Sequence, residues 1–428
     1  ATLDPIAELG LDEYNVVVPD ITTMTREALK QTGLDNKAVV KCKNMFALGI
    51  CFWLFDRPEE YARKYLDSKF AKKNPAVAEA NKLAIDAGYN YAANTHQFAN
   101  TYTVAPAALE KGLYRSINGN VATAWGLCAA AEKAGLPLFC GSYPITPATV
   151  ILEELAKRKD LGVKTVQAED EIAGICTAIG AAFAGNFAVT TTSGPGLSLK
   201  SEALGLAVMT ELPLVVVDVQ RGGPSTGLPT KTEQSDLQQA LYGRNGECPV
   251  AVVAASSPSD CFHFAFEAGR IAMEHMTPVI LLTDGFIANG SEPWRIPSMK
   301  DYPAIQPPIV DEAPEGGFMP YVRNEKLARG WAFPGKVGLE HRVGGLEKDC
   351  VKGCISHDPA NHQKMVSTRA AKVAKIAEDI PVQTVYGDAE GDLLVVGWGG
   401  TRGHLQNAVD EMRREGRRVS LCHFNYID

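Results

Sequence analysis

The sequence predicts an α/β protein whose central part is a doubly wound parallel sheet. Between residues 119 and 285, short apolar segments typical of strands alternate with helix-like segments. One of them, PLVVVDVQ at 213–220, is almost entirely apolar and rich in β-branched residues, which is typical of a strand buried on both faces of a parallel sheet. This alternation predicts helices on both faces of the sheet and ligand sites at the carboxyl ends of the strands.

The alternating segments define the expected elements in chain order. Strands are expected at 136–141, 163–167, 187–192, 213–220, 250–255 and 278–285. Helices are expected at 120–135, 171–185, 196–211 and 233–243. A further helix is expected to start with Ser257 as N-cap, Pro258 in the first position and Asp260 in the first turn, and to run to Met276.

The stretch GSYPITPATV at 141–150 predicts the start of another helix. Thr146 is a suitable N-cap, and Pro147 has its φ already set for the first helical position. The residues behind it form one apolar stripe, consisting of Ile151, Leu152 and Leu155. The N–H groups of the first turn are therefore expected to be free to meet an anion or a polarised oxygen.

The flanking regions have a different character. Residues 1–112 are helix-rich, with 75–91 as the clearest amphipathic piece, whereas residues 291–380 are loop-like and dense in Pro and Gly. A second strand–helix–strand unit is expected over 392–428, with an inward helix face made of Leu405, Val409 and Met412. One such unit cannot close its own sheet, so either the sequence is part of a longer chain or a partner completes the sheet.

Composition excludes several classes of function. The chain has 428 residues, 46% of them hydrophobic, and a net charge of −8, with no long basic run that would favour nucleic acid. The longest apolar stretch, 44–55, is shorter than the about 20 residues that span a bilayer, so it predicts a buried helix. The acidic opening predicts no signal peptide. Ten single cysteines, among them Cys51, Cys128 and Cys176, indicate reduced core thiols in a cytoplasmic protein.

One segment has several potential metal ligands. CVKGCISHDPANH contains Cys350, Cys354, His357 and His362, but the spacing matches no standard zinc finger. An ordinary polar loop is the favoured interpretation, with metal binding as the alternative.

Acidic residues open the helix expected at 171–185. Glu169, Asp170 and Glu171 can complement the helix dipole, or one of them can be a buried carboxylate that bonds a heterocycle nitrogen. The nearby TTTSGPGLSLKS lacks the second glycine of a phosphate-binding loop. Its SGPG is expected to be a tight turn beside a flat ligand, or a close contact between strand and helix.

Arg221 directly follows the most buried strand. A buried arginine requires a partner, and two interpretations stay open. It can form a structural ion pair with Glu233 or Asp236, or it can hold a substrate carboxylate in bidentate fashion.

Four motifs resemble one enzyme family. The chain is similar to the α subunit of the 2-oxoacid:ferredoxin oxidoreductases, most closely the 2-oxoglutarate type, in YPITP, QAEDEIAG, TSGPGLSLKSEALGLAVMTELP and VQRGGPSTGLPTKTEQ. The resemblance implies four regions: the C-terminal part of a γ domain (1–112), a pyrimidine-binding domain of a thiamine diphosphate enzyme (113–300), a connector (301–380) and the start of a transketolase C-terminal-like domain (381–428). The Gly-rich opening of the γ domain and the rest of the final domain are missing, so the sequence is expected to be part of a longer subunit.

The resemblance also implies contacts with the cofactor. The glutamate matching Glu169 would hydrogen-bond N1′ of the aminopyrimidine ring and favour its imino tautomer, with a raised pKa suited to sharing that proton. Tyr143, Pro144 and Ile145 would lie against the pyrimidine. Asp170 and Glu171 keep the helix-dipole interpretation.

Four further residues would face the substrate. Thr146 would point at the 2-oxoacid and steady a developing oxyanion. Arg221 would clamp the C1 carboxylate with help from Thr230. Lys231 is a weaker candidate for the distal carboxylate, since a solvated loop lysine is the simpler interpretation.

The implied reaction is reversible oxidative decarboxylation of 2-oxoglutarate with coenzyme A and ferredoxin. The chain lacks the diphosphate–Mg²⁺ motif and the cluster cysteines, so a β subunit is expected to bring Mg²⁺ and a [4Fe–4S] cluster to an (αβ)₂ assembly that shares thiamine diphosphate. The alternatives are the same chemistry on pyruvate or a branched-chain acid, or a non-catalytic scaffold with a thiamine-type fold.

Overall fold

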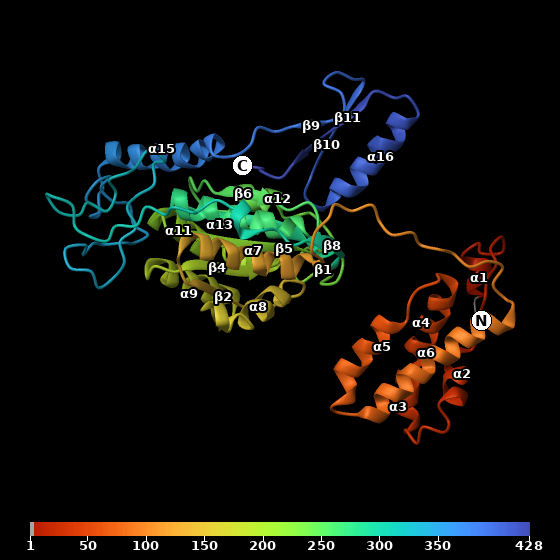
Figure 1. Ribbon diagram of the computed structural model, residues 1–428. Helices are drawn as coiled ribbons and strands as arrows, with labels where there is room; N and C mark the ends of the chain where they lie inside the picture. The colour runs from red at the N-terminus through yellow and green to blue at the C-terminus, as the bar shows by residue number, and fades with distance from the viewer. Residues whose placement is uncertain (1–3) are drawn as a thin grey trace. The chain divides into compact units, whose positions relative to one another are not determined.

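The computed structural model describes residues 4–428, and the chain divides into two compact units, residues 1–111 and 112–428 (Figure 1). Each unit has its own core. Among the described residues, no helix combines the length and the apolar character needed to cross a bilayer.

The first unit is helical. Its helices are α1 (Pro5–Glu8), α2 (Ile21–Ala28), α3 (Asn36–Lys41), α4 (Lys43–Leu54), α5 (Glu60–Leu66), the π-helical turn η1 (Asp67–Ala71) and α6 (Pro75–Thr95). The expected amphipathic helix is confirmed as α6, with Asn74 as N-cap. Helices α4 and α6 approach closely at Gly49 and Gly88, where an added Cβ would overlap the backbone of the opposite helix.

The expectation that 44–55 is a buried helix is only partly correct. Helix α4 forms, but its buried residues are Phe46, Gly49 and Ile50, and Cys51 is exposed. Cys176 is exposed as well, on α9 (Glu171–Phe183), and Cys128 is half-buried. The prediction of core thiols is therefore wrong for Cys51 and Cys176, because an apolar segment in a helix still presents one side to solvent. All ten cysteines are free thiols.

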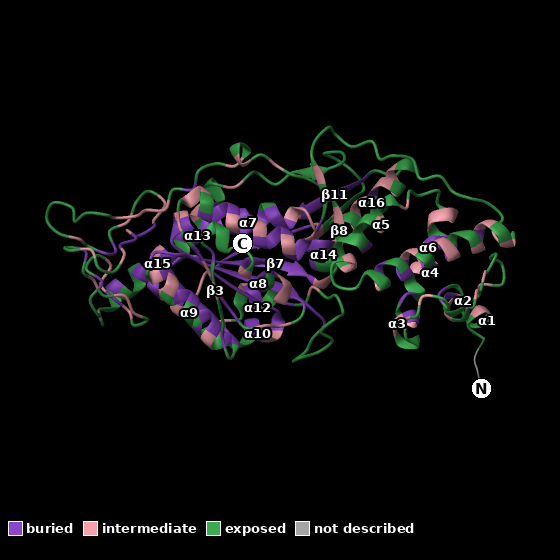
Figure 2. Ribbon diagram, turned by 60° about the horizontal axis from the view of Figure 1, so that its bottom comes forward, coloured by how far each residue is buried: buried purple, intermediate pink, exposed green. Residues whose placement is uncertain are grey.

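The second unit is built on the predicted parallel sheet. Its six strands lie in the order β3-β2-β4-β5-β7-β6, and every neighbouring pair is parallel. The strands are β2 (Leu138–Ser142), β3 (Lys164–Gln167), β4 (Phe187–Thr192), β5 (Leu214–Gln220), β6 (Ala251–Ala254) and β7 (Pro278–Asp284). Each expected strand is confirmed. Strands β4, β5, β6 and β7 are buried along their whole length (Figure 2).

Helices cover both faces of this sheet, as expected of a doubly wound fold. One core contains residues of α7 (Gly119–Ala134), α8 (Thr149–Ala156) and α13 (Asp260–His275). The other contains residues of α9 (Glu171–Phe183), α10 (Gly194–Leu199), α11 (Ser201–Thr210) and α12 (Leu237–Tyr242). The α/β class is confirmed, and the carboxyl ends of the parallel strands share one edge.

The helix start expected at Thr146 is wrong, and the one expected at Ser257 is partly correct. Helix α8 starts at Thr149 behind Ala148, without a side-chain cap, because residues 146–148 form a turn that the Thr149 N–H closes onto the Ile145 carbonyl. Helix α13 runs from Asp260, three residues after the expected N-cap, but the Ser257 hydroxyl oxygen accepts the Asp260 N–H at 3.3 Å as a capping side chain does, while its proton is donated to Glu292. The stripe of Ile151, Leu152 and Leu155 is buried as predicted.

Smaller elements surround the sheet. The strands β1 (Tyr114–Asn118) and β8 (Ser291–Arg295) form an antiparallel pair, and α14 (Gly285–Asn289) follows β7. The connector contains a helix that the sequence analysis missed, α15 (Pro359–Lys375), although Asp358 and Pro359 form a typical helix start. Short 3₁₀ turns occur at η2 (Lys159–Leu161), η3 (Met299–Asp301), η4 (Ile376–Glu378) and η5 (Gly399–Thr401).

The C-terminal segment forms the expected strand–helix–strand unit. Strand β10 (Leu393–Trp398) pairs in parallel with β11 (Val419–Phe424), which also pairs with the short β9 (Val385–Tyr386). Helix α16 (Arg402–Arg414) packs Leu405, Val409 and Met412 against them, as predicted.

Candidate functional site

A cavity of about 290 Å³ opens where three strands of the sheet end. Its wall comes from the turn after β2 with the start of α8, from the loop after β5, and from α14 after β7. The lining residues are Thr146, Pro147, Thr149, Val150, Pro229, Thr230, Gly285 and Asn289. The structure therefore brings together Thr146 and Thr230, two residues that the sequence analysis selected from segments far apart in the chain.

The turn after β2 presents its side chains outward. Ser142, the last residue of β2, is buried and its hydroxyl bonds Thr191 of β4, which fixes the base of the turn. Tyr143 and Thr146 beyond it are exposed, and Ile145 packs partly against the core. The Thr146–Pro147 peptide bond is cis.

Arg221 ties this turn to the loop after β5. The side chain is 6% exposed, and its Nη1 donates to the Thr146 carbonyl at 2.6 Å while Nη2 donates to the Thr226 carbonyl at 2.8 Å. The expected ion pair with Glu233 or Asp236 does not form: Glu233 instead accepts hydrogen bonds from the Gly223 N–H and from Ser235. Arg221 is thus held by two carbonyls behind the cavity wall and does not line the cavity.

The loop after β5 is a compact hairpin-like structure. Gly222 donates to the Lys231 carbonyl and accepts from the Leu228 N–H. Gly227 has a φ of 49°, and a Cβ there would overlap the Gly222 carbonyl, so this position requires glycine. Thr230 and Lys231 are both exposed, but only Thr230 lines the cavity.

Glu169 lies beside the turn after β2. Strands β2 and β3 are neighbours, with Ser142 opposite Gln167, and the Ala168 N–H donates to the Ser142 carbonyl at 2.9 Å. Glu169 follows directly, and its side chain is exposed. Asp170 accepts from the Ala173 N–H at 2.7 Å, which confirms its interpretation as a helix-start residue.

The contact between Glu171 and Lys200 was not predicted from the sequence. Glu171 is buried, and its carbonyl accepts a hydrogen bond of 2.7 Å from the fully buried Lys200 ammonium. Burial lowers the pKa of Lys200 to about 8. The only sequence signal is a lysine inside an otherwise apolar helical segment. Its bond fixes the start of α9, directly after Glu169.

The SGPG motif packs closely against other segments of the same chain. A Cβ on Gly194 would come within 2.6 Å of the Asp236 carboxylate, and one on Gly196 would overlap the Thr192 hydroxyl. Of the two interpretations of the motif, close packing of strand and helix is the correct one.

The cysteine–histidine segment is a polar loop over 350–358, and its last residues, including His362, form the first turn of α15. His362 Nδ1 lies 2.7 Å from Glu347, and the Cys350 N–H donates to Asn361. Within residues 4–428, no three side chains of His, Cys, Asp or Glu group as metal ligands would.

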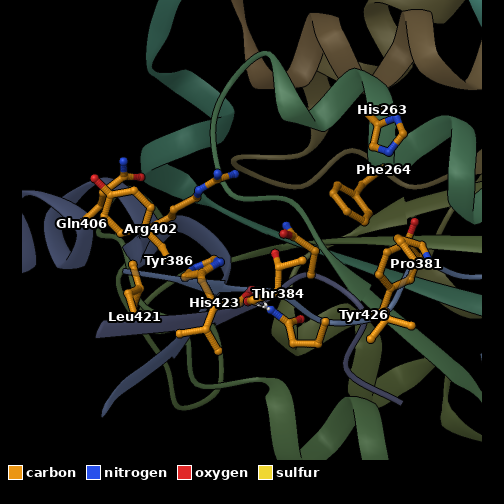
Figure 3. A pocket seen from close by; sticks show the side chains of 14 residues that line it. His263, Phe264, Pro381, Thr384, Tyr386, Arg402, Gln406, Leu421, His423 and Tyr426 are labelled. Atoms are coloured by element: carbon orange, nitrogen blue, oxygen red, sulfur yellow. Dashed lines mark hydrogen bonds between the residues drawn. The ribbon is translucent and has the colours of Figure 1, made fainter. Parts of the chain in front are cut away.

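A second cavity, of about 600 Å³, lies between α13 and the C-terminal strands (Figure 3). His263 and Phe264 of α13 face Tyr386, Arg402 and His423 across it. None of the residues discussed above lines this cavity, so the strand-end cavity remains the candidate functional site.

The doubly wound sheet, with its exposed loops at the carboxyl edge, defines an α/β ligand-binding domain. Residues 130–355 match the family described as "Pyruvate flavodoxin/ferredoxin oxidoreductase, thiamine diP-bdg", and residues 3–91 match "Pyruvate ferredoxin/flavodoxin oxidoreductase". The chain belongs to this oxidoreductase family and contains its thiamine diphosphate-binding domain.

Relatives agree over most of the chain. It is 53% identical over 427 residues to 2-oxoglutarate oxidoreductase subunit KorA of Mycobacterium tuberculosis, covering 99% of this chain and 65% of that protein. It is 36% identical over 311 residues to 2-oxoglutarate synthase subunit KorA of Methanothermobacter marburgensis, covering 72% of this chain and 80% of the relative. The chain thus spans less than two thirds of the Mycobacterium protein.

A solved structure has the same fold. The 2-oxoglutarate:ferredoxin oxidoreductase from Magnetococcus marinus, determined with 2-oxoglutarate, coenzyme A and succinyl-CoA bound, superposes with a TM-score of 0.83 at 34% identity. The match covers 94% of this chain and 68% of the Magnetococcus chain.

Proposed function

We propose that this chain acts in the α subunit of a 2-oxoglutarate:ferredoxin oxidoreductase, which converts 2-oxoglutarate and coenzyme A to succinyl-CoA and CO₂ and passes electrons to ferredoxin. The observation that carries the proposal is the pairing of β2 with β3, since it sets the exposed Glu169 beside the turn 143–148, in which Tyr143 and Thr146 are exposed. The relatives named for 2-oxoglutarate and the structure bound to it support the choice of substrate.

The regions of the chain have separate roles in this proposal. Residues 1–112 are the C-terminal part of the γ domain, which the family match at 3–91 supports. Residues 113–300 bind the pyrimidine, 301–380 connect, and 381–428 begin a transketolase C-terminal-like domain.

The residues present fit the pyrimidine side of thiamine diphosphate. An exposed carboxylate beside a turn with exposed and half-buried side chains can meet a ring nitrogen and a ring face together. When bound, thiamine diphosphate would supply the nucleophilic carbon for decarboxylation of a 2-oxoacid. Glu169 would hold the cofactor by a hydrogen bond to N1′ of the aminopyrimidine and carry the proton exchanged there, and Tyr143, Pro144 and Ile145 would support the ring.

The cavity wall binds the 2-oxoacid. The Thr146 hydroxyl donates a hydrogen bond to the oxygen that gains negative charge, and the Thr230 hydroxyl donates one to the C1 carboxylate. Arg221 orients Thr146 and places its positive charge behind this carboxylate. Lys231 meets the distal carboxylate from the exposed loop.

A β subunit completes the site. The exposure of Glu169, Tyr143, Thr146 and Thr230 on the chain supports a site shared with a partner. The β subunit holds Mg²⁺ with the diphosphate and carries the [4Fe–4S] cluster that reduces ferredoxin, in an (αβ)₂ assembly. Coenzyme A is the acyl acceptor.

The test is the replacement Glu169→Gln in the complete oxidoreductase. We expect 2-oxoglutarate-dependent ferredoxin reduction to fall at least about 100-fold, because a general acid–base group contributes roughly that much, while the subunits still copurify. Asp170→Asn is the matched control, since it removes a neighbouring charge but keeps the oxygen that caps α9. Unchanged turnover in Glu169→Gln, or a preference for pyruvate over 2-oxoglutarate in the wild type, would contradict the proposal.

A further inference from the structure

Two carboxyl groups are buried together beneath the loop that carries Thr230. Asp218 lies on β5 and is 0% exposed, and Asp236 lies just before α12 and is 9% exposed. The loop 221–235 runs from the end of β5 to Asp236. The two side chains therefore flank its beginning and its end.

The two carboxyl groups lie close enough that each shifts the pKa of the other. The geometry agrees, because the Asp236 N–H bonds the side chain of Gln220, which lies two residues after Asp218 and therefore on the same face of β5. Among the residues described, no donor reaches either oxygen of Asp218 or Oδ2 of Asp236. Two ionised carboxylates offer only acceptors, so the contact becomes a hydrogen bond only if one of them carries a proton. Leaving two buried charges unpaired side by side would be far more costly than retaining that proton.

The surroundings favour the protonated form. Burial raises the pKa of both carboxyls, and that of Asp218 rises well above its ordinary value. The charged neighbours are Glu233, which raises the pKa of Asp236, and Arg221, which lowers it. The packed elements β4, α10 and α12 contain no charged residue, whereas α9, which also packs against β5, carries Glu171, and its carbonyl accepts from Lys200 behind α10. Asp284 of β7 accepts hydrogen bonds from the N–H groups that start α14.

Further contacts join the pair to the backbone at both ends of the loop. The Asp236 N–H donates to Gln220 Oε1 at 3.1 Å, and Gln220 Nε2 donates to the Thr283 carbonyl of β7 at 3.0 Å. The Asp236 carboxylate lies against Gly194, where a Cβ would come within 2.6 Å of both oxygens. Any movement of Asp236 away from Asp218 would therefore also move the end of the loop.

We propose that Asp218 and Asp236 share one proton, and that this carboxyl–carboxylate pair holds the loop 221–235 in the position that sets Arg221, Pro229 and Thr230 around the candidate cavity. Both are positioning residues, because they act through the loop and do not line the cavity. The benefit to a 2-oxoacid rests on the proposed function, whereas the shared proton and the order of the loop do not.

Infrared difference spectroscopy of the full chain tests the proton. At pH 7 the wild type is expected to show the C=O stretch of a protonated carboxyl that disappears in Asp218→Asn and in Asp236→Asn. Asp388→Asn is the control, because Asp388 is exposed and paired with Arg413. If neither buried variant loses such a band, the carboxyls do not share a proton and the proposal is wrong.

Hydrogen exchange tests the effect on the loop. The amides of Gly222, Leu228 and Lys231 are hydrogen-bonded within it. Asp218→Ala, which leaves Asp236 without its partner, is expected to reduce their protection at least about tenfold, whereas Asp218→Asn should retain it because the amide still donates. Equal protection in both variants overturns the positioning role. If the wild type shows the carboxyl band and the loop protection but does not turn over 2-oxoglutarate, the result counts against the proposed function alone.

Discussion

Arg221 Nη1 lies 2.6 Å from the carbonyl oxygen of Thr146, and this hydrogen bond joins two segments separated by 75 residues of sequence. The second bond, from Nη2 to Thr226, makes the guanidinium a bracket between the turn after β2 and the loop after β5. Both segments line the candidate cavity. The width of that cavity therefore depends on one planar group with donors in fixed directions.

Arg221→Lys should impair use of the 2-oxoacid. A lysine keeps the charge but cannot reach both carbonyls in the same geometry, and one hydrogen bond to a charged group contributes about 1.5–3 kcal/mol. We expect kcat/KM for 2-oxoglutarate to fall at least about tenfold, mainly through KM. Steady-state kinetics of the complete enzyme measure this effect.

The control for this change is Arg342→Lys, since Arg342 is an exposed residue of the connector. Its kinetics should match those of the wild type. If Arg221→Lys also leaves KM and kcat unchanged, the bracket has no role in substrate binding.

The sheet could be predicted because each strand is defined by local composition. The run at 213–220 forms β5, and 187–192 forms β4, with every residue buried in both strands. Parallel strands covered by helices leave a continuous apolar pattern, which is visible in sequence without knowledge of the strand order.

The site was only partly predictable because it depends on contacts between distant segments. Thr146 and Thr230 could be selected from motifs. The two carbonyls that accept hydrogen bonds from Arg221 could not be predicted, because every residue has a backbone carbonyl. The pair of Asp218 and Asp236 was missed for a similar reason. Asp236 was considered only as a partner of Arg221, whereas Asp218 lies on the same face of β5 as Gln220, whose side chain accepts the Asp236 N–H.

Gly126→Ala should destabilise the second unit. Gly126 of α7 faces α13 so closely that a Cβ would overlap the Phe262 carbonyl oxygen, and backbone cannot move aside as a side chain would. Overpacking of this kind costs about 1–3 kcal/mol. Thermal or urea unfolding of the full chain measures the loss.

Gly180→Ala adds the same methyl group but should stabilise the second unit. Gly180 lies within α9, is exposed, and has nothing within 4 Å of an added Cβ. Alanine is favoured over glycine in a helix by about 1 kcal/mol, so the free energy of unfolding should rise. If Gly126→Ala also raises the free energy of unfolding, the approach of α7 and α13 is not tight.

Glu211→Gln should destabilise the contact between the end of α11 and the connector. The carboxylate is 0% exposed and accepts bonds of 2.5 and 2.6 Å from Arg323 and one of 2.6 Å from Lys372. Removing one partner of a buried ion pair costs about 3–5 kcal/mol, because the remaining charges stay buried. Urea unfolding should show this loss, and Glu390→Gln, an exposed glutamate, should not.

The Glu211 carboxylate should also make the free energy of unfolding depend on pH. The two cations lower the pKa of Glu211 to about 2 from an ordinary value of 4.5. The unfolded chain therefore takes up a proton before the folded one, and the stabilisation is present above pH 4.5 and is lost as the pH falls toward 2. Unfolding experiments across this range should give a smaller slope for Glu211→Gln; an identical slope would contradict the assignment.

Thr146→Val should lower turnover more than affinity. The change is nearly isosteric and removes only the exposed hydroxyl at the cavity, which is proposed to bond the oxygen that gains charge in the reaction. Loss of such a donor costs about 100-fold or more in kcat, while ground-state binding changes little. Thr146→Ser keeps the hydroxyl and should recover most of kcat. Thr149→Val removes a hydroxyl from the same cavity. We expect kcat to change less than about twofold, because Thr149 is not proposed to contact the oxygen that gains charge. A parallel fall in both valine variants would show that the cavity responds to lost polarity in general, and Thr146 would then have no specific role.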